Sequence, residues 1–247
     1  MISDDAAAAE IAHLAGARLL DLRAAGGPAD QLKAAGDRTS HELIIAELQR
    51  RFPDDAVLSE EAADDPVRLG RDRVWIIDPL DGTREFSEPP REDWAVHVAL
   101  VVAGELTVGA VALPARGLVL STADAPPMPA AHQGPLRLLV SRTRPTEHAR
   151  LLAEQLDAEL VPMGSAGAKA MAVVLGEADI YAHSGGQYEW DSAAPVAVAA
   201  AAGMHVSRLD GSPLRYNQAN PWLPDVLICL PEVAPRVIDL CRDADGS

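Results

Sequence analysis

The chain is poor in cysteine, in aromatic residues and in long apolar runs. Its 247 residues include two cysteines, Cys229 and Cys241, which form neither a CxxC pair nor a disulfide framework. A reducing, cytoplasmic location is therefore expected. No apolar run approaches the ~20 residues of a membrane span, and residues 1–10 lack the basic and apolar regions of a signal peptide. We therefore expect no membrane association.

Positive charge is also scarce. Lys and Arg number 21 against 37 Asp and Glu, which gives a formal net charge of −16. This balance argues against a nucleic acid polymer as partner, because polynucleotide binding needs a basic footprint. It leaves a small phosphate ester open as substrate, because a bound metal ion can invert the local field.

The pattern of apolar residues changes along the chain. Helices are expected at residues 4–25, 37–51, 145–156, 166–175, 191–202 and 233–242. Strands are expected at residues 56–58, 74–77, 94–102, 106–113, 117–120, 136–140, 159–161, 178–182, 204–207 and 226–230. The Pro- and Ala-rich segment 122–135 is the candidate linker. The pattern predicts an α+β subdomain (1–130) with most of the acidic motifs, then an α/β subdomain (131–247) that contributes Asp191 and substrate-contacting loops.

The run WIIDPLDGT, residues 75–83, carries the strongest chemical signal. Asp78 and Asp81 come just after the strand expected at residues 74–77. Either acid alone is common in turns and caps, and that interpretation stays open. Pro79 fixes one backbone angle between them, so both carboxylates and the carbonyl of Leu80 can point the same way. Such hard oxygen ligands suit the Mg²⁺ ions of a two-metal phosphatase.

The residues around these acids extend the pattern. Gly82 and Thr83 would open a helix whose free N–H groups suit a phosphate, and the Thr83 hydroxyl is placed to orient a water. Glu60 and Glu61, in LSEE, follow another short apolar strand. They are either acids at a strand end that point into a site or an ordinary solvated pair.

Further candidates lie at expected helix starts. Asp37 and Asp191 are each either an N-cap or an acid that faces a site. In GSAGAK, Ser165 and Lys169 suit a nucleotide or sugar contact, or simply close packing of a helix.

Two arginines, Arg142 and Arg144, lie in the segment SRTRP. They either hold a second anionic group or belong to a solvated loop. The histidines show no metal-ligand spacing and are interpreted as surface or core residues.

LSEE, WIIDPLDGT and EWDSAAP, in this order, resemble the motifs of the lithium-sensitive, magnesium-dependent phosphomonoesterases whose namesake is inositol monophosphatase. DPLDGTREF, GSAGAKA and GMHVSRLDGSPLRYN are most similar to the CysQ branch, the 3'(2'),5'-bisphosphate nucleotidases, and especially to its actinobacterial members. The resemblance covers the chain from residue 37 to about residue 217. It implies a layered αβαβα sandwich, a homodimer and two or three Mg²⁺ ions per site.

The resemblance also implies residue roles. The positions that match metal ligands are Glu60, Asp78, the Leu80 carbonyl, Asp81 and Asp191. The positions expected to contact substrate are Asp81, Gly82, Thr83, Ser165, Lys169 and Asp191, to which Arg142 and Arg144 would add a second-phosphate contact. Thr83, with Asp37 or Glu60, would activate the attacking water, and Glu61 matches a second acid.

The implied reaction is Mg²⁺-dependent hydrolysis of the 3'-phosphate of adenosine 3',5'-bisphosphate in sulfur assimilation, with 3'-phosphoadenylyl sulfate as a further substrate. The alternatives are an inositol 1-phosphate or fructose 1,6-bisphosphate phosphatase, or a non-catalytic protein that binds phosphosugars or nucleotides. Residues 185–191 lack the acid that inositol monophosphatases place before Trp-Asp, which argues against inositol. Arg144 stands where many bisphosphate nucleotidases carry His.

Overall fold

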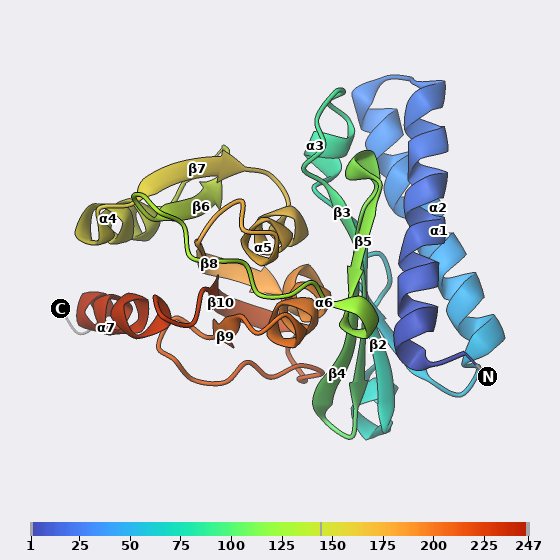
Figure 1. The fold of residues 1–247 in the computed structure, drawn as a ribbon. Coiled ribbons are helices and arrows are strands. Elements are labelled where there is room, and N and C mark those ends of the chain that lie inside the picture. The colour runs from blue at the N-terminus through green and yellow to red at the C-terminus, as the bar shows by residue number, and fades with distance from the viewer. Residues whose placement is uncertain (1, 144, 246–247) are drawn as a thin grey trace.

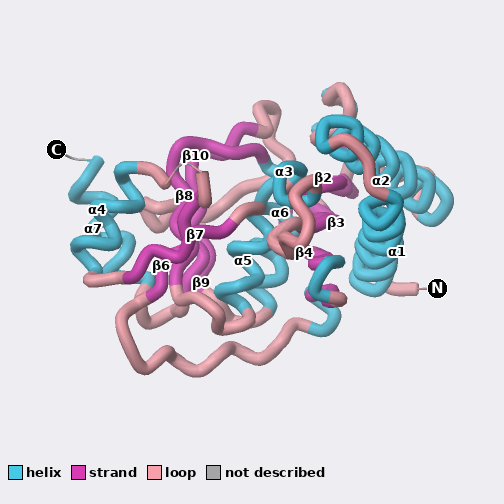
Figure 2. Tube along the Cα trace, turned by 90° about the horizontal axis from the view of Figure 1, so that it is seen from above, coloured by secondary structure: helices cyan, strands magenta, loops and turns pink. Residues whose placement is uncertain are grey.

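Two five-stranded sheets alternate with three layers of helices in the computed structural model, which describes residues 2–143 and 145–245 (Figure 1). The principal helices are α1 (Asp4–Ala25), α2 (Ala29–Arg51), α3 (Thr83–Phe86), α4 (Glu147–Leu156), α5 (Ala166–Val174), α6 (Glu189–Ala201) and α7 (Ala234–Asp245). Helices α1 and α2 form one outer layer, α5 and α6 the middle layer, and α4 and α7 the other outer layer (Figures 1 and 2). The predicted αβαβα sandwich is confirmed.

The first sheet has the strand order β1-β2-β3-β4-β5. Its strands are β1 (Ala56–Ser59), β2 (Arg73–Asp81), β3 (Ala95–Val102), β4 (Glu105–Leu113) and β5 (Leu118–Ser121). Strand β1 runs parallel to β2, and the other neighbours are antiparallel. Ala103 and Gly104 join β3 to β4 with φ of 51° and 85°, which is the geometry of a tight hairpin turn. The predicted meander is therefore confirmed.

The second sheet has the order β7-β6-β8-β10-β9. Its strands are β6 (Arg137–Ser141), β7 (Glu159–Met163), β8 (Ile180–Tyr188), β9 (His205–Ser207) and β10 (Trp222–Cys229). Strand β6 is parallel to β7 and β8, and β10 is antiparallel to β8 and β9. This mixed pairing agrees with the strand–helix alternation of the second half of the chain.

The core between the sheets is built from both halves of the chain. Leu58 and Val111 of the first sheet belong to the same buried cluster as Met171, Val198 and Ile228, which come from the middle helices and the second sheet. The segment between η3 (Thr122–Asp124) and β6 therefore joins two sheets that share one core. The division into subdomains at residues 130 and 131 stays a prediction.

Three predicted element boundaries are wrong in ways that matter for the site. Helix α2 begins at Ala29 instead of residue 37. Pro28, with its restricted φ, is the N-cap residue, and Gly36 is a buried residue within the helix and does not interrupt it. Strand β2 continues through Asp81 instead of ending at residue 77, and β8 continues to Tyr188. Among the described helices, none has the length and apolar character that crossing a membrane requires.

Candidate metal and phosphate site

Three of the predicted ligands meet at the end of β2 and the start of α6. One carboxylate oxygen each of Asp78, Asp81 and Asp191 lies within 4.8 Å of the other two. Asp191 is the third residue of α6, not its N-cap, and its Oδ2 accepts the N–H of Tyr188 at 2.7 Å. The fold thus gathers carboxylates that are far apart in the sequence.

The turn that carries Asp78 and Asp81 is fixed from two sides. Asp78 Oδ1 accepts the N–H of Leu80 at 3.1 Å, and the register of β2 against β3 shifts between the two acids. From α2, the Ser40 hydroxyl donates to the carbonyl of Pro79 at 2.6 Å. This helix therefore fixes the backbone between the two acids.

Asp81 is surrounded by hydrogen-bond donors from α5 and its N-terminus. Its carboxylate accepts the Ser165 hydroxyl, the N–H of Ala166 at 3.1 Å and the N–H of Gly167 at 2.6 Å. The Nε2 atom of His97 lies 3.4 Å from Asp81 Oδ2. Burial alone would raise the pKa of Asp81, but the donors and positive charges around it lower that pKa to about 2. Asp81 is therefore a fixed anion.

The neighbouring acids show the opposite shift. Burial, followed by the charge of Glu60, raises the pKa of Asp78 well above its ordinary value. Burial and the charge of Asp81 raise the pKa of Asp191 to about 6, and burial with the charge of Asp191 raises that of Glu60 to about 7. Glu60 is thus within electrostatic reach of the three aspartates.

This donor set fits a hard divalent cation. Four carboxylates crowd one another so closely that three of them resist ionisation, and a cation among them would relieve that repulsion. Carboxylate and carbonyl oxygens are the ligands that Mg²⁺ prefers. The carbonyl of Leu80, the fifth predicted ligand, belongs to the residue before Asp81 and accepts the Thr83 hydroxyl at 3.1 Å.

Asp37 and Thr83 come together as a pair. Asp37 lies inside α2, so it is not an N-cap, and its Oδ1 is 3.4 Å from the Thr83 hydroxyl oxygen. Burial and the charge of Glu61 raise the pKa of Asp37 to about 6. Gly82, with φ of 82°, precedes Thr83, and a Cβ atom there would lie 3.0 Å from the Ser165 side chain. The turn therefore requires glycine.

Ser165 and Lys169 lie behind Asp81. Ser165 is the N-cap of α5, and its oxygen accepts the N–H of Ala168 at 2.9 Å while its hydroxyl donates to Asp81. Lys169 is buried, its Nζ donates to the Ser165 carbonyl at 2.7 Å, and burial lowers its pKa. A small cavity of about 40 Å³ lies beside Lys169. Their substrate contacts stay predictions.

The SRTRP arginines are placed only in part. Arg142 forms ion pairs with Glu85 at 2.8 Å and Glu88 at 3.0 Å. A contact between Arg142 and a second phosphate would have to replace these pairs, so that role stays a prediction. Arg144 lies outside the described residues.

His97 is a site residue that the sequence did not reveal. It is fully buried on β3, and its Nδ1 lies 3.0 Å from the carbonyl of Trp190, next to Asp191. The interpretation as a core residue is correct for its burial, but misses its place between Asp81 and α6. The strand expected at residues 94–102 contains His97, but nothing in the sequence indicated what that residue contacts.

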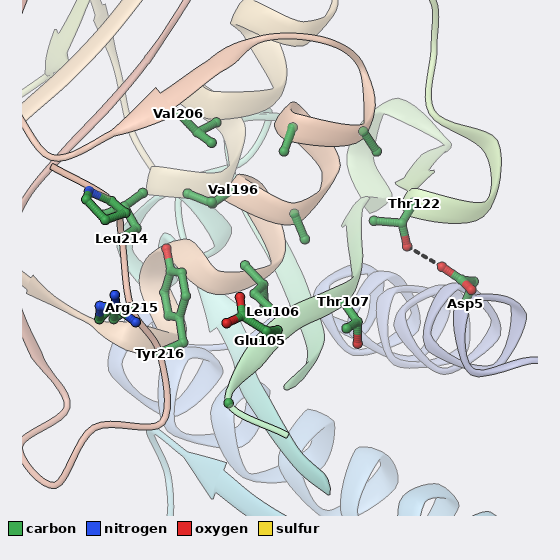
Figure 3. A pocket seen from close by; sticks show the side chains of 15 residues that line it. Asp5, Glu105, Leu106, Thr107, Thr122, Val196, Val206, Leu214, Arg215 and Tyr216 are labelled. Atoms are coloured by element: carbon green, nitrogen blue, oxygen red, sulfur yellow. Dashed lines mark hydrogen bonds between the residues drawn. The ribbon is translucent and has the colours of Figure 1, made fainter. Parts of the chain in front are cut away.

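A separate cavity of about 570 Å³ lies at the other end of α6 (Figure 3). Val196 on α6, Leu106 on β4 and Tyr216 line it, and the Asp5 and Thr122 side chains are hydrogen-bonded at its edge (Figure 3). The described residues that line it include none of the predicted site residues. The cavity is therefore distinct from the acidic site.

Comparisons with known proteins show which proteins this chain is similar to. A model of the inositol monophosphatase family matches residues 4–239. The 3'-phosphoadenosine 5'-phosphate phosphatase of Mycobacterium bovis is 55% identical over 241 residues, which cover 93% of this chain and 90% of that protein. The 3'(2'),5'-bisphosphate nucleotidase CysQ of Escherichia coli is 32% identical over 202 residues, 76% of this chain and 81% of that one. The crystal structure of CysQ from Bacteroides thetaiotaomicron superimposes with a TM-score of 0.77 at 28% identity, over 91% of this chain and 96% of that one.

Proposed function

Because the chain belongs to the inositol monophosphatase family, we propose that it is a 3'(2'),5'-bisphosphate nucleotidase. It hydrolyses the 3'-phosphate of adenosine 3',5'-bisphosphate and releases AMP and phosphate. The observation that carries this proposal is the 55% identity to a 3'-phosphoadenosine 5'-phosphate phosphatase over nearly the whole chain. The cluster of carboxylates beside the Asp37–Thr83 pair supports a phosphoryl-transfer chemistry.

The proposed cofactor is Mg²⁺, two or three ions per site. Glu60, Asp78, Asp81, Asp191 and the Leu80 carbonyl would hold it. When bound, Mg²⁺ supplies neutralisation of the phosphate charge and a water of lowered pKa. In the same proposal Asp81, which is already ionised, contributes a permanent negative charge, while the other acids give up protons when the metal binds.

The protein's own groups would orient the water and the phosphate. With Asp37 ionised, the Thr83 hydroxyl would turn its single hydrogen bond from the Leu80 carbonyl to that carboxylate, and its oxygen would accept a hydrogen bond from the attacking water. The backbone N–H groups of Gly82 and Thr83 would bind the phosphate oxygens. Asp37 is half ionised near pH 6, so this arrangement is favoured above that pH.

The finer parts of the proposal concern specificity and setting. Ser165 and Lys169 would lie near the leaving nucleoside, and Arg142, if released from Glu85 and Glu88, would reach a second phosphate. We further propose 3'-phosphoadenylyl sulfate as a second substrate, a role in sulfur assimilation, a cytoplasmic location and a homodimer. Light scattering on a sizing column tests the last of these, since a monomeric mass would refute it.

The deciding experiment is phosphate release with Mg²⁺ at equal low concentrations of three substrates. These are adenosine 3',5'-bisphosphate, inositol 1-phosphate and fructose 1,6-bisphosphate. The proposal requires a kcat/KM at least about tenfold higher for the nucleotide, equivalent to ~1.4 kcal/mol. Equal values, or a preference for either sugar phosphate, would reject the nucleotidase assignment while leaving a metal-dependent phosphatase.

A further inference from the structure

A buried carboxylate that is not a predicted ligand lies at the start of α6. Glu189 is 1% exposed, and its two carboxylate oxygens accept backbone N–H groups from Asn217 at 2.6 Å and Gln218 at 2.8 Å. Glu189, which lies two residues before Asp191, is therefore hydrogen-bonded to the segment that precedes β10.

A buried guanidinium lies on the other side of that segment. Arg68 is also 1% exposed, and it donates to the Asn217 side-chain oxygen at 2.7 Å and to the Gln218 carbonyl at 2.9 Å. It also forms a bidentate pair with Asp64, with distances of 2.6 and 2.9 Å. Asp64 lies four residues after Glu60, in the loop that leads into the short 3₁₀ helix Pro66–Gly70, and Arg68 lies within that helix.

Three segments therefore meet in one buried polar network. One carries Glu60, one carries Asp191, and the segment 216–218 joins them. A second bond ties the same segment to α6, because the hydroxyls of Tyr216 and Ser192 are 3.1 Å apart and Ser192 follows Asp191. Buried ion pairs often add little net stability relative to well-packed apolar residues. The hydrogen bonds of this network instead connect the three segments to one another.

We propose that Glu189 and Arg68 are positioning residues that set the separation between the Glu60 segment and Asp191, and thereby the affinity of the acidic site for Mg²⁺. This inference rests on the proposed function in taking Mg²⁺ as the ion. Glu189 and Arg68 do not touch substrate or metal in this scheme, because their polar atoms are taken up by the network. They act indirectly, because they fix the positions of the backbone segments that contain Glu60 and Asp191.

Two variants disturb the network with little change of shape. Glu189→Gln replaces one carboxylate oxygen by an amide that faces an N–H donor. Asn217→Gly removes the oxygen that Arg68 contacts, and glycine tolerates the φ of 57° that Asn217 adopts. A matched control is Asp179→Asn, because Asp179 is 1% exposed and accepts the Arg137 N–H at 2.8 Å and its side chain at 2.9 Å. It lies before β8, while Asp191 follows the end of that strand.

The test is isothermal titration of each protein with MgCl₂ alone, alongside thermal melts. We expect Mg²⁺ to bind about tenfold more weakly to Glu189→Gln and Asn217→Gly, as for the loss of supporting contacts around a metal site. Asp179→Asn should melt at a lower temperature with an unchanged Kd. In activity assays the Mg²⁺ requirement of the two variants should rise while kcat at saturating Mg²⁺ changes little.

Unchanged Mg²⁺ affinity in both variants would overturn the inference. So would an equal loss in Asp179→Asn, since the effect would then reflect general destabilisation. Should Glu189→Gln fail to fold, Asn217→Gly alone decides. The titration uses no substrate, so a wild-type protein that binds Mg²⁺ but does not hydrolyse the nucleotide rejects the nucleotidase function without affecting this test. A wild-type protein that binds no Mg²⁺ overturns both.

Discussion

At the scale of single residues, the carboxylates of the acidic site differ in how readily they ionise. Asp81 is an anion fixed by donors from Ser165, Ala166 and Gly167, whereas burial and the charge of Glu60 raise the pKa of Asp78. The fixed anion needs no proton release to meet a cation. Asp81 therefore is the residue whose charge the site depends on most.

Asp81→Asn should remove most of the activity. The amide loses the negative charge and places an N–H₂ group against N–H donors. We expect kcat/KM for adenosine 3',5'-bisphosphate to fall by about three orders of magnitude, or ~4 kcal/mol of lost transition-state stabilisation. Circular dichroism should show that the fold is kept. Turnover near the wild-type level would refute the role of Asp81.

Gly167→Ala should disturb the contact between His97 and Asp81. A Cβ atom at this position would lie 2.0 Å from Nε2 of His97, which is fully buried on β3. Overpacking of this kind costs about 1–3 kcal/mol and should displace the ring from Asp81. Thermal melts and Mg²⁺ titrations should both shift. Gly70→Ala is the control, because a Cβ atom there has nothing within 4 Å, and an equal effect there would contradict the explanation.

At the scale of elements, side chains of α2 contact several residues of the site. Asp37 accepts a hydrogen bond from the Thr83 hydroxyl, and Ser40 donates one to the Pro79 carbonyl. His41 is hydrogen-bonded to the Ser59 hydroxyl, with 3.0 Å between Nδ1 and Oγ. Ser59 lies just before Glu60. One helix therefore positions parts of two acidic motifs.

Ser40→Ala should loosen this attachment. It leaves the buried Pro79 carbonyl without its 2.6 Å donor, and we expect a loss of about 1–2 kcal/mol in the free energy of unfolding. The Mg²⁺ affinity should fall as well, because the backbone between Asp78 and Asp81 is less fixed. Ser207→Ala is the counterpart, since its hydroxyl donates to the Arg208 carbonyl at 2.7 Å on β9, away from the acids. The Ser207→Ala variant should lose stability but keep its Mg²⁺ affinity. An equal loss of Mg²⁺ affinity in both variants would contradict the role of α2 in positioning the acids.

At the scale of the whole molecule, the net charge of −16 and the clustered acids couple stability to pH. Glu60 has a folded pKa of about 7 against an ordinary 4.5, and Asp37 and Asp191 have about 6 against 3.8. Between these values the folded state binds more protons than the unfolded state. The metal-free protein therefore loses stability as the pH rises from about 4 to 7.

Mg²⁺ should reverse this trend. The metal displaces the shared protons, so its stabilising effect should be larger at about pH 8 than at about pH 5. At 100-fold excess over Kd it should raise Tm by about 5–10 °C at the higher pH. Melting curves with EDTA and with Mg²⁺ at both pH values check this. A metal-free Tm that climbs across the window, or Mg²⁺ shifts of equal size, would contradict the prediction.

The sequence by itself determined the layered architecture, the family and the acidic motifs. Alternation of apolar residues, turn residues such as Gly104 and the spacing of Asp78 and Asp81 are local signals, so they can be read without the fold. The boundaries of α2 and β2 were missed because Gly36 and Pro79 are locally unfavourable in a helix and a strand, and contacts from distant elements outweigh that preference.

Only the tertiary structure decided how these motifs combine. It placed His97 beside Asp81, paired Arg142 with Glu85 and joined Glu189 to Arg68 through the segment 217–218. Each of these contacts joins residues that are distant in the chain. The physical reason is that burial and hydrogen bonding depend on which elements pack together, and a pattern within one segment does not contain that information.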